Sequence, residues 1–167
     1  MHPIYIAIWT KGHDPLDSII KWITHGTATH AAFVRNDRVI ENFYPHVRER
    51  AWKPGEKAKV ALFRIEGAHV YNYQDLDRWL DEQLKHPPSY SIKDLFRYAL
   101  GWPPLRGNRC FCSQFVLRGI RATMPKKQLL ARLPAPDWAS PRDLLISPRL
   151  REAGFRKPFR PGDFVWK

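Results

Sequence analysis

Residues 30–43 read HAAFVRNDRVIENF, two apolar-rich runs on either side of the polar pair Asn36-Asp37. Runs of this length that flank a two-residue polar pair are typical of a tight β-hairpin. The sequence therefore predicts two antiparallel strands, His30–Arg35 and Arg38–Phe43. The register of this hairpin decides which of its side chains share a face.

The predicted turn pairs Arg35 with Arg38 across the hairpin. Counting along both strands from that pair places His30 and Glu41 on one face as diagonal neighbours, with backbones roughly 7–8 Å apart. Their side chains can close that gap to a hydrogen bond, and a carboxylate there would fix the imidazole tautomer and support its charged form. A register slip of one residue would instead turn Glu41 to the opposite face, as an ordinary solvent-facing strand residue.

The rest of the chain predicts strands first and helices later. Strands are expected at residues 4–9 and 59–65, and between them a helix that begins at Asp14 and ends at Gly26. Helical signals follow around Leu76–Leu84, after a cap at Ser91, from Cys112 to about Met124, after Ser140 and after Ser147. This segregated order indicates an α+β fold. The 167 residues, 44% of them hydrophobic, suit one domain over residues 1–167.

Basic residues are concentrated in the last part of the chain. The net charge is +12, and residues 104–167 hold 14 Lys and Arg against 4 Asp and Glu. Such asymmetry predicts attraction to a polyanion, whether nucleic acid, an anionic membrane or an acidic cell-wall polymer. The alternative is a solvated basic surface with no partner, and charge alone does not decide between them.

The two cysteines, Cys110 and Cys112, stand one residue apart. This spacing is too short for an ordinary disulfide, and the chain lacks the further ligands of a zinc site. We therefore expect free thiols, no metal and no cofactor. Residues 1–10 carry no basic leader or cleavage site and no later run reaches spanning length, which predicts a cytoplasmic protein without a transmembrane segment.

Cys112 falls where an extended segment is expected to enter a helix. A thiol there faces the positive end of the helix dipole and unpaired backbone N–H groups, which favour the thiolate. The same N–H groups could hold the oxyanion that forms when sulfur attacks a carbonyl. The alternative for Cys112 is a small buried apolar residue at a helix start, and for Cys110 that structural role is the only one indicated.

A cysteine nucleophile needs a base, and His30 is the candidate. Of the seven histidines, it alone begins a strand within an otherwise apolar run. The predicted hairpin supplies Glu41 as the group that orients it. The sequence thus points to three candidate catalytic residues: Cys112, His30 and Glu41.

Four segments together resemble a known family. They are Thr24-His25-Gly26, Thr29-His30-Ala31-Ala32-Phe33-Val34, Val39-Ile40-Glu41 and Phe111-Cys112-Ser113-Gln114-Phe115-Val116. Their order is similar to that of the YiiX-like, circularly permuted group of NlpC-type papain-like cysteine peptidases, in which the histidine strand precedes the cysteine helix. The resemblance implies a permuted papain-like fold, a small antiparallel sheet or barrel packed on helices. It also implies Cys112 as nucleophile, His30 as base and Glu41 as third member.

Two positions depart from the family pattern, Gln114 where relatives commonly carry Glu and Asn42 where a small residue usually follows the acid. Neither belongs to the proposed triad. The implied activity is hydrolysis or acyl transfer at an amide, peptide or ester bond through a thioester. The substrates implied are peptidoglycan peptides, other peptides or amides, and lipid esters.

Two readings from other classes remain open at this point. A non-catalytic nucleic-acid- or polyanion-binding protein would rest on the basic region from Arg106 to Lys167, where cations adjoin aromatics at Phe155-Arg156 and Phe159-Arg160. That region lacks a recognised binding motif. An inactive adaptor with the same fold is the third reading.

Overall fold

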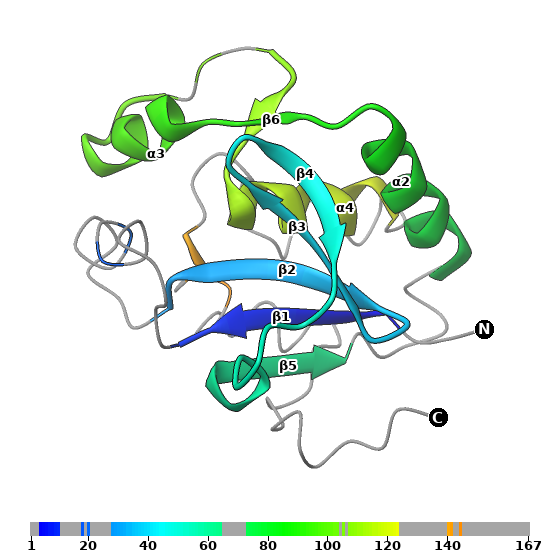
Figure 1. Cartoon of the computed structure of the whole chain (residues 1–167). Coiled ribbons are helices and arrows are strands. Elements are labelled where there is room, and N and C mark those ends of the chain that lie inside the picture. Colours follow the sequence, from blue (N-terminus) through cyan, green and yellow to red (C-terminus); the bar gives the residue numbers. More distant parts are fainter. Residues whose placement is uncertain are drawn as a thin grey trace.

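The structure is a computed structural model of the whole chain (Figure 1). It describes residues 4–10, 18, 20, 28–64, 73–103, 105, 107–123, 140, 141 and 144. Of the predicted helix from Asp14 to Gly26, only Ser18 and Ile20 are among these residues, and both are helical. The helix start at Ser147 and most of the basic C-terminal half lie outside them.

The described residues form a seven-stranded sheet with the order β5-β1-β2-β3-β4-β6-β7. The strands are β1 Tyr5–Trp9, β2 His30–Arg35, β3 Arg38–Phe43, β4 His46–Arg50, β5 Val60–Arg64, β6 Ser89–Tyr90 and β7 Arg109–Cys110. All neighbours pair antiparallel except β6 and β7, which run parallel. The sheet is open, with β5 and β7 at its edges.

Three α-helices accompany the sheet in the described part of the chain: α2 Tyr73–Lys85, α3 Ile92–Ala99 and α4 Cys112–Thr123. A short 3-10 turn, η1 Lys57–Lys59, precedes β5. Helix α4 packs against β2 and β3, and α2 packs against α4 and β4, so both cover one face of the sheet (Figure 1). None of these helices combines the length and apolar character needed to cross a bilayer.

The predicted hairpin is present with the predicted bounds and register. Arg35 lies opposite Arg38, and Phe33 lies opposite Ile40. Asn36 and Asp37 have φ angles of 51° and 56°. Both values fall in the left-handed region that a two-residue hairpin turn requires and that Asn and Asp tolerate best.

The α+β class predicted from the sequence is confirmed, and two details differ from expectation. The sheet is open rather than closed into a barrel, and its β6–β7 pair is parallel rather than antiparallel. Strand β4 was also not predicted. Its sequence, HVRER, carries one apolar residue among charged ones, so hydrophobic alternation gives no signal there.

Helix α4 sits unusually close to its neighbours at Gly119. A Cβ atom built there would lie 2.7 Å from a ring atom of Trp79 and 2.8 Å from a ring atom of Phe33. The Phe33 and Trp79 rings also contact each other and Phe115. Only glycine therefore allows α4 this approach to the sheet and to α2.

We predict that Gly119→Ala destabilises the fold by about 1–3 kcal/mol, because the added methyl group overpacks a dense aromatic cluster. The expectation runs against helix propensity, which favours Ala over Gly by about 1 kcal/mol. Urea unfolding measures the change. The exposed neighbour Ala122→Ser is the control and should stay within about 0.5 kcal/mol. A Gly119→Ala protein as stable as wild type would contradict the close packing.

Candidate active site

The start of α4 is fixed by its own first turn. The Phe111 backbone N–H donates to Gln114 Oε1 at 3.1 Å, and the Phe115 N–H donates to the Phe111 carbonyl at 3.0 Å. This is the return half of a capping box, in which the third helical residue bonds back to the residue before the helix. Gln114 caps the helix through its amide oxygen, a role that a Glu carboxylate at this position of a capping box can also perform. Cys112 is the first helical residue, as the sequence predicted.

His30 is the first residue of β2, and its imidazole interacts with Glu41 of the sheet and with Cys112 of α4. Its Nε2 lies 3.0 Å from Glu41 Oε2, and Cys112 lies close enough to raise the pKa of the ring through charge and hydrogen bonding. The structure thus brings all three predicted residues together from three separate elements: α4, β2 and β3.

Two aromatic rings hold the His30 imidazole in place. The Trp9 ring lies 5.1 Å from it, centroid to centroid, and the Phe43 ring meets it edge-on at 5.8 Å. Trp9 is the partner of His30 across the β1–β2 pair. The ring is therefore confined on both sides by neighbours that cannot compete for its nitrogen atoms.

The environment of His30 favours its charged form. Burial is the largest single influence and disfavours the imidazolium, but negative charge on Cys112 and the hydrogen bonds to Cys112 and Glu41 outweigh it. Together these effects raise the pKa of His30 to about 10. The site thus stabilises an imidazolium beside the Cys112 sulfur at neutral pH.

The Glu41 carboxylate is 2% exposed and has a partner for each oxygen. Arg48 donates to Oε1 from Nε at 3.0 Å and from Nη2 at 2.9 Å. Arg50 donates to Oε1 at 2.7 Å and to Oε2 at 3.0 Å. Burial raises the pKa of Glu41, but its bonds to His30 and Arg50 hold that pKa far below the ordinary value.

The network extends beyond Glu41 and returns to the imidazole. Arg50 also bonds both oxygens of Glu56, at 2.7 and 2.8 Å, and Trp9 Nε1 donates to Glu56 Oε1 at 2.9 Å. Burial opposes ionisation of Glu56, yet the bonds from Arg50 and from the Lys53 backbone N–H lower its pKa. Because Trp9 packs on His30, the second carboxylate indirectly supports the position of the ring.

Cys110 has a different environment two residues away. The Asn42 amide Nδ2 donates to the Cys110 carbonyl at 2.8 Å and contacts its sulfur at 3.1 Å. Burial raises the pKa of Cys110 to about 11, which keeps the thiol protonated. Asn42 points away from Glu41, as the register predicted, and ties β3 to β7.

Sequence reasoning missed the residues around the triad: Arg48, Arg50, Glu56, Trp9 and Asn42. One signal was available for two of them. Arg48 and Arg50 alternate directly after the hairpin, so a third strand there would place both on the face of Glu41, with Arg48 opposite it. Among the residues that the structure describes, no cluster of His, Cys, Asp and Glu side chains could hold a metal ion.

Comparison with known proteins adds no assignment for this site. No protein-family model matches the chain, and no curated protein matches it either.

We predict that Arg50→Met destabilises the protein by about 3–5 kcal/mol, because it leaves two buried carboxylates without their shared partner. The side chain of Arg50 is 17% exposed and that of Arg48 is 37% exposed, so Arg48→Met is the matched control and should have a clearly smaller effect. Urea unfolding at pH 7 compares the two. Equal losses would contradict the central place of Arg50.

The acid dependence of stability should also change in Arg50→Met. Glu41 and Glu56 have lowered pKa values in the fold, so they contribute stability above their ordinary value of 4.5 that is lost as the pH falls. Removing Arg50 reduces that lowering, so the variant should lose less additional stability on acidification than wild type. Unfolding curves between pH 7 and pH 3 measure the difference.

A separate prediction concerns the proton on His30. NMR titration of the ring should show it protonated through pH 8, and Cys112→Ala and Glu41→Gln should each lower its pKa. The change should be larger for Cys112→Ala, because Cys112 contributes more than Glu41 to the raised pKa. Cys110→Ala is the control and should leave the titration unchanged. A wild-type pKa near 6.5 would contradict the pairing.

Proposed function

We propose that this protein is a cysteine-dependent hydrolase or acyltransferase that acts on an amide, peptide or ester bond. The observation that carries the proposal is the meeting of Cys112, at the first turn of α4, with His30, whose ring Nε2 bonds the Glu41 carboxylate. The order of these residues along the chain supports assignment to the YiiX-like, circularly permuted papain-like group. The packing of α4 against β2 and β3 is consistent with that fold.

In the first half of the proposed reaction, the Cys112 thiolate attacks the substrate carbonyl carbon and a C–S bond forms. The carbonyl electron pair moves to oxygen, where backbone N–H groups at the helix start can stabilise the oxyanion. When the tetrahedral intermediate collapses, the bond to nitrogen or oxygen breaks. The His30 imidazolium gives its proton to the leaving group, and a thioester remains on Cys112.

In the second half, neutral His30 takes a proton from water or from another acceptor, which attacks the thioester carbonyl. The C–S bond breaks, the acyl group leaves and the thiolate–imidazolium pair is restored. Glu41 stays ionised throughout, because Arg48 and Arg50 neutralise it. Its role is to hold the ring orientation and to stabilise the imidazolium of each half-reaction.

We predict that Cys112→Ala abolishes turnover of a peptide, amide or ester substrate, whereas Cys110→Ala preserves it. The two sulfurs are both buried, so their neighbours decide their reactivity: a charged imidazole beside Cys112 and a neutral amide beside Cys110. Iodoacetamide, a small alkylator, should label Cys112 far faster than Cys110 at pH 7, as measured by mass spectrometry. Glu41→Gln should slow labelling and turnover without abolishing them.

Circular dichroism and urea unfolding separate catalysis from folding in these variants. A Cys to Ala change is expected to cost no more than a few kcal/mol, so each variant should fold. Equal activity of both cysteine variants would remove Cys112 from the mechanism. Equally slow labelling of both thiols in the folded wild type would favour a binding protein over an enzyme.

A further inference from the structure

Helix α3 is apolar on two sides. Its inner side packs Leu95 against Ile20, and the Tyr98 ring meets the Phe111 ring edge-on at 6.1 Å. A surface helix that buries one face in this way ordinarily presents charged and polar residues on the other. The outer side of α3 does not follow that pattern.

The outer side of α3 and the turn that follows it carry four large apolar residues, which we call the α3 ridge: Ile92, Phe96, Leu100 and Trp102. The first three are spaced by four residues, and all four are between 37% and 60% exposed. Among the described residues, Tyr44 is the only other large apolar side chain with such exposure. The exposed apolar surface of the described chain is thus gathered at one place rather than scattered.

The helix end holds Trp102 in a defined position. Gly101 has a φ of 69°, its N–H donates to the Tyr98 carbonyl at 3.1 Å, and the Trp102 N–H donates to the Arg97 carbonyl at 2.8 Å. These two bonds and the left-handed glycine form a Schellman motif. The Arg97 guanidinium also lies 5.7 Å from the indole centroid. The exposed indole is therefore a fixed feature of the surface.

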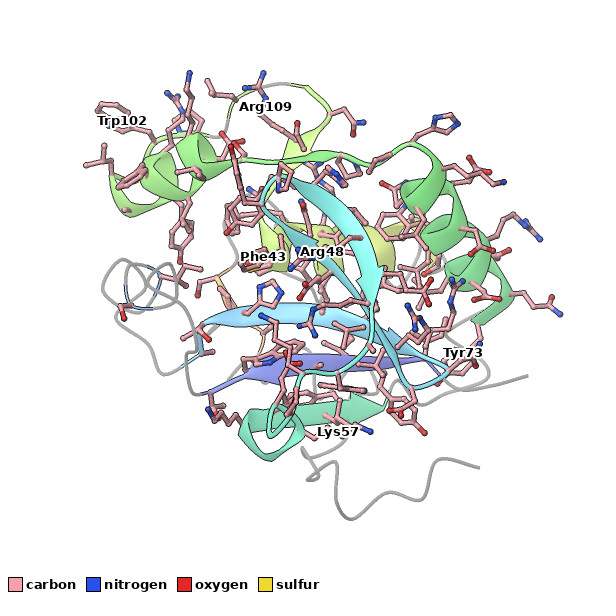
Figure 2. All side chains as sticks on the ribbon, viewed as in Figure 1. Phe43, Arg48, Lys57, Tyr73, Trp102 and Arg109 are labelled. Atoms are coloured by element: carbon pink, nitrogen blue, oxygen red, sulfur yellow. The ribbon has the colours of Figure 1, made fainter. Side chains whose placement is uncertain are left out.

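The ridge is flanked by positive charge. Lys93 and Arg97 belong to the same helix as Ile92 and Phe96. Trp102 and Arg109 lie along the same edge of the molecule in Figure 2. Between residues 86 and 110 the only acidic residue is Asp94, which is buried and accepts the Leu105 N–H at 2.7 Å. No carboxylate of that segment is therefore exposed beside the ridge.

We propose that the α3 ridge is a docking surface for an anionic lipid bilayer. Exposed Trp, Phe and Leu beside Lys and Arg is the combination that binds the membrane interface, since the apolar side chains enter the headgroup boundary and the cations meet anionic lipids. A second copy of the chain is a poorer occupant, because two ridges face to face would bring Lys93, Arg97 and their counterparts together at a net charge of +12 each.

The ridge is connected directly to the strand that leads to Cys112. The Ser91 N–H, at the cap of α3, donates to the Cys110 carbonyl at 3.0 Å, and β6 pairs with β7 just before it. Docking through α3 would thus hold the start of α4 near the bilayer surface. The docking itself does not depend on the catalytic proposal, and Cys112→Ala should bind vesicles as wild type does.

Cosedimentation of the full chain with vesicles tests the proposal. Vesicles of phosphatidylcholine with about 30% phosphatidylserine should bind the protein at least about tenfold more tightly than phosphatidylcholine alone, and added salt should weaken that binding. Absence of binding to the anionic vesicles would overturn the proposal. So would equal binding to both kinds of vesicle.

The double variant Phe96→Gln with Leu100→Gln separates the ridge from the basic regions elsewhere in the chain. It should lose about tenfold or more in vesicle affinity, whereas Tyr44→Gln, which removes the exposed aromatic outside the ridge, should stay within about twofold. Circular dichroism checks that both fold. Unchanged binding of the double variant would assign the affinity to another surface and overturn the proposal.

A charge-matched pair tests the cationic flank. Lys93→Glu and Lys53→Glu change the net charge equally, but Lys53 lies close to Lys57, which Figure 2 shows at the opposite end of the view from Trp102. Only Lys93→Glu should weaken binding strongly. Equal effects would mean that net charge alone attracts the protein, which contradicts docking through α3.

Quenching by brominated lipids provides a measurement that needs no disruption of the helix. Wild type should lose more tryptophan fluorescence than Trp102→Phe, because the difference reports the depth of that indole. Identical quenching would place Trp102 outside the bilayer and overturn the proposal. Analytical ultracentrifugation tests whether a second copy of the chain occupies the ridge instead. A dimer in wild type that the double variant abolishes would assign the ridge to self-association and overturn the proposal.

Discussion

The ionised carboxylate of Glu41, buried in the sheet, is the constraint on which the rest of the site depends. A buried charge is tolerated only when it is paired and hydrogen-bonded, so its neighbours have to supply cations. His30 does so from β2, and Arg48 and Arg50 do so from β4. One side chain of β3 thereby joins the two adjacent strands and orients the imidazole. The geometry of the base follows from this electrostatic requirement.

Strand β3 acts on both of its faces. Glu41 anchors the imidazole on one face, and the next residue, Asn42, holds the Cys110 carbonyl on the other. Successive side chains of a strand point to opposite faces, so consecutive positions can serve two different layers. The strand therefore sets the position of the base and also that of the segment that carries the nucleophile.

The two cysteines illustrate how neighbours decide the chemistry of one residue type. Cys110 is enclosed beside a neutral amide, and burial keeps its thiol protonated. Cys112 lies at the first turn of α4, beside an imidazole whose pKa is raised by its interactions with Cys112 and Glu41. A single intervening residue, Phe111, separates a structural sulfur from the candidate nucleophile. The same segment bonds to the cap of α3 at Ser91, so the proposed site and the apolar ridge share a support.

The sequence by itself determined the β2–β3 hairpin, its register and the first residue of α4. These features depend on residues close together in the chain, namely a two-residue turn and the first turn of a helix, so local rules were sufficient. The meeting of Cys112 with His30, the pairing of Arg48 and Arg50 with Glu41, and the open sheet were decided only by the tertiary structure. They depend on which distant strands become neighbours and on how a buried charge is then compensated, and local periodicity contains neither.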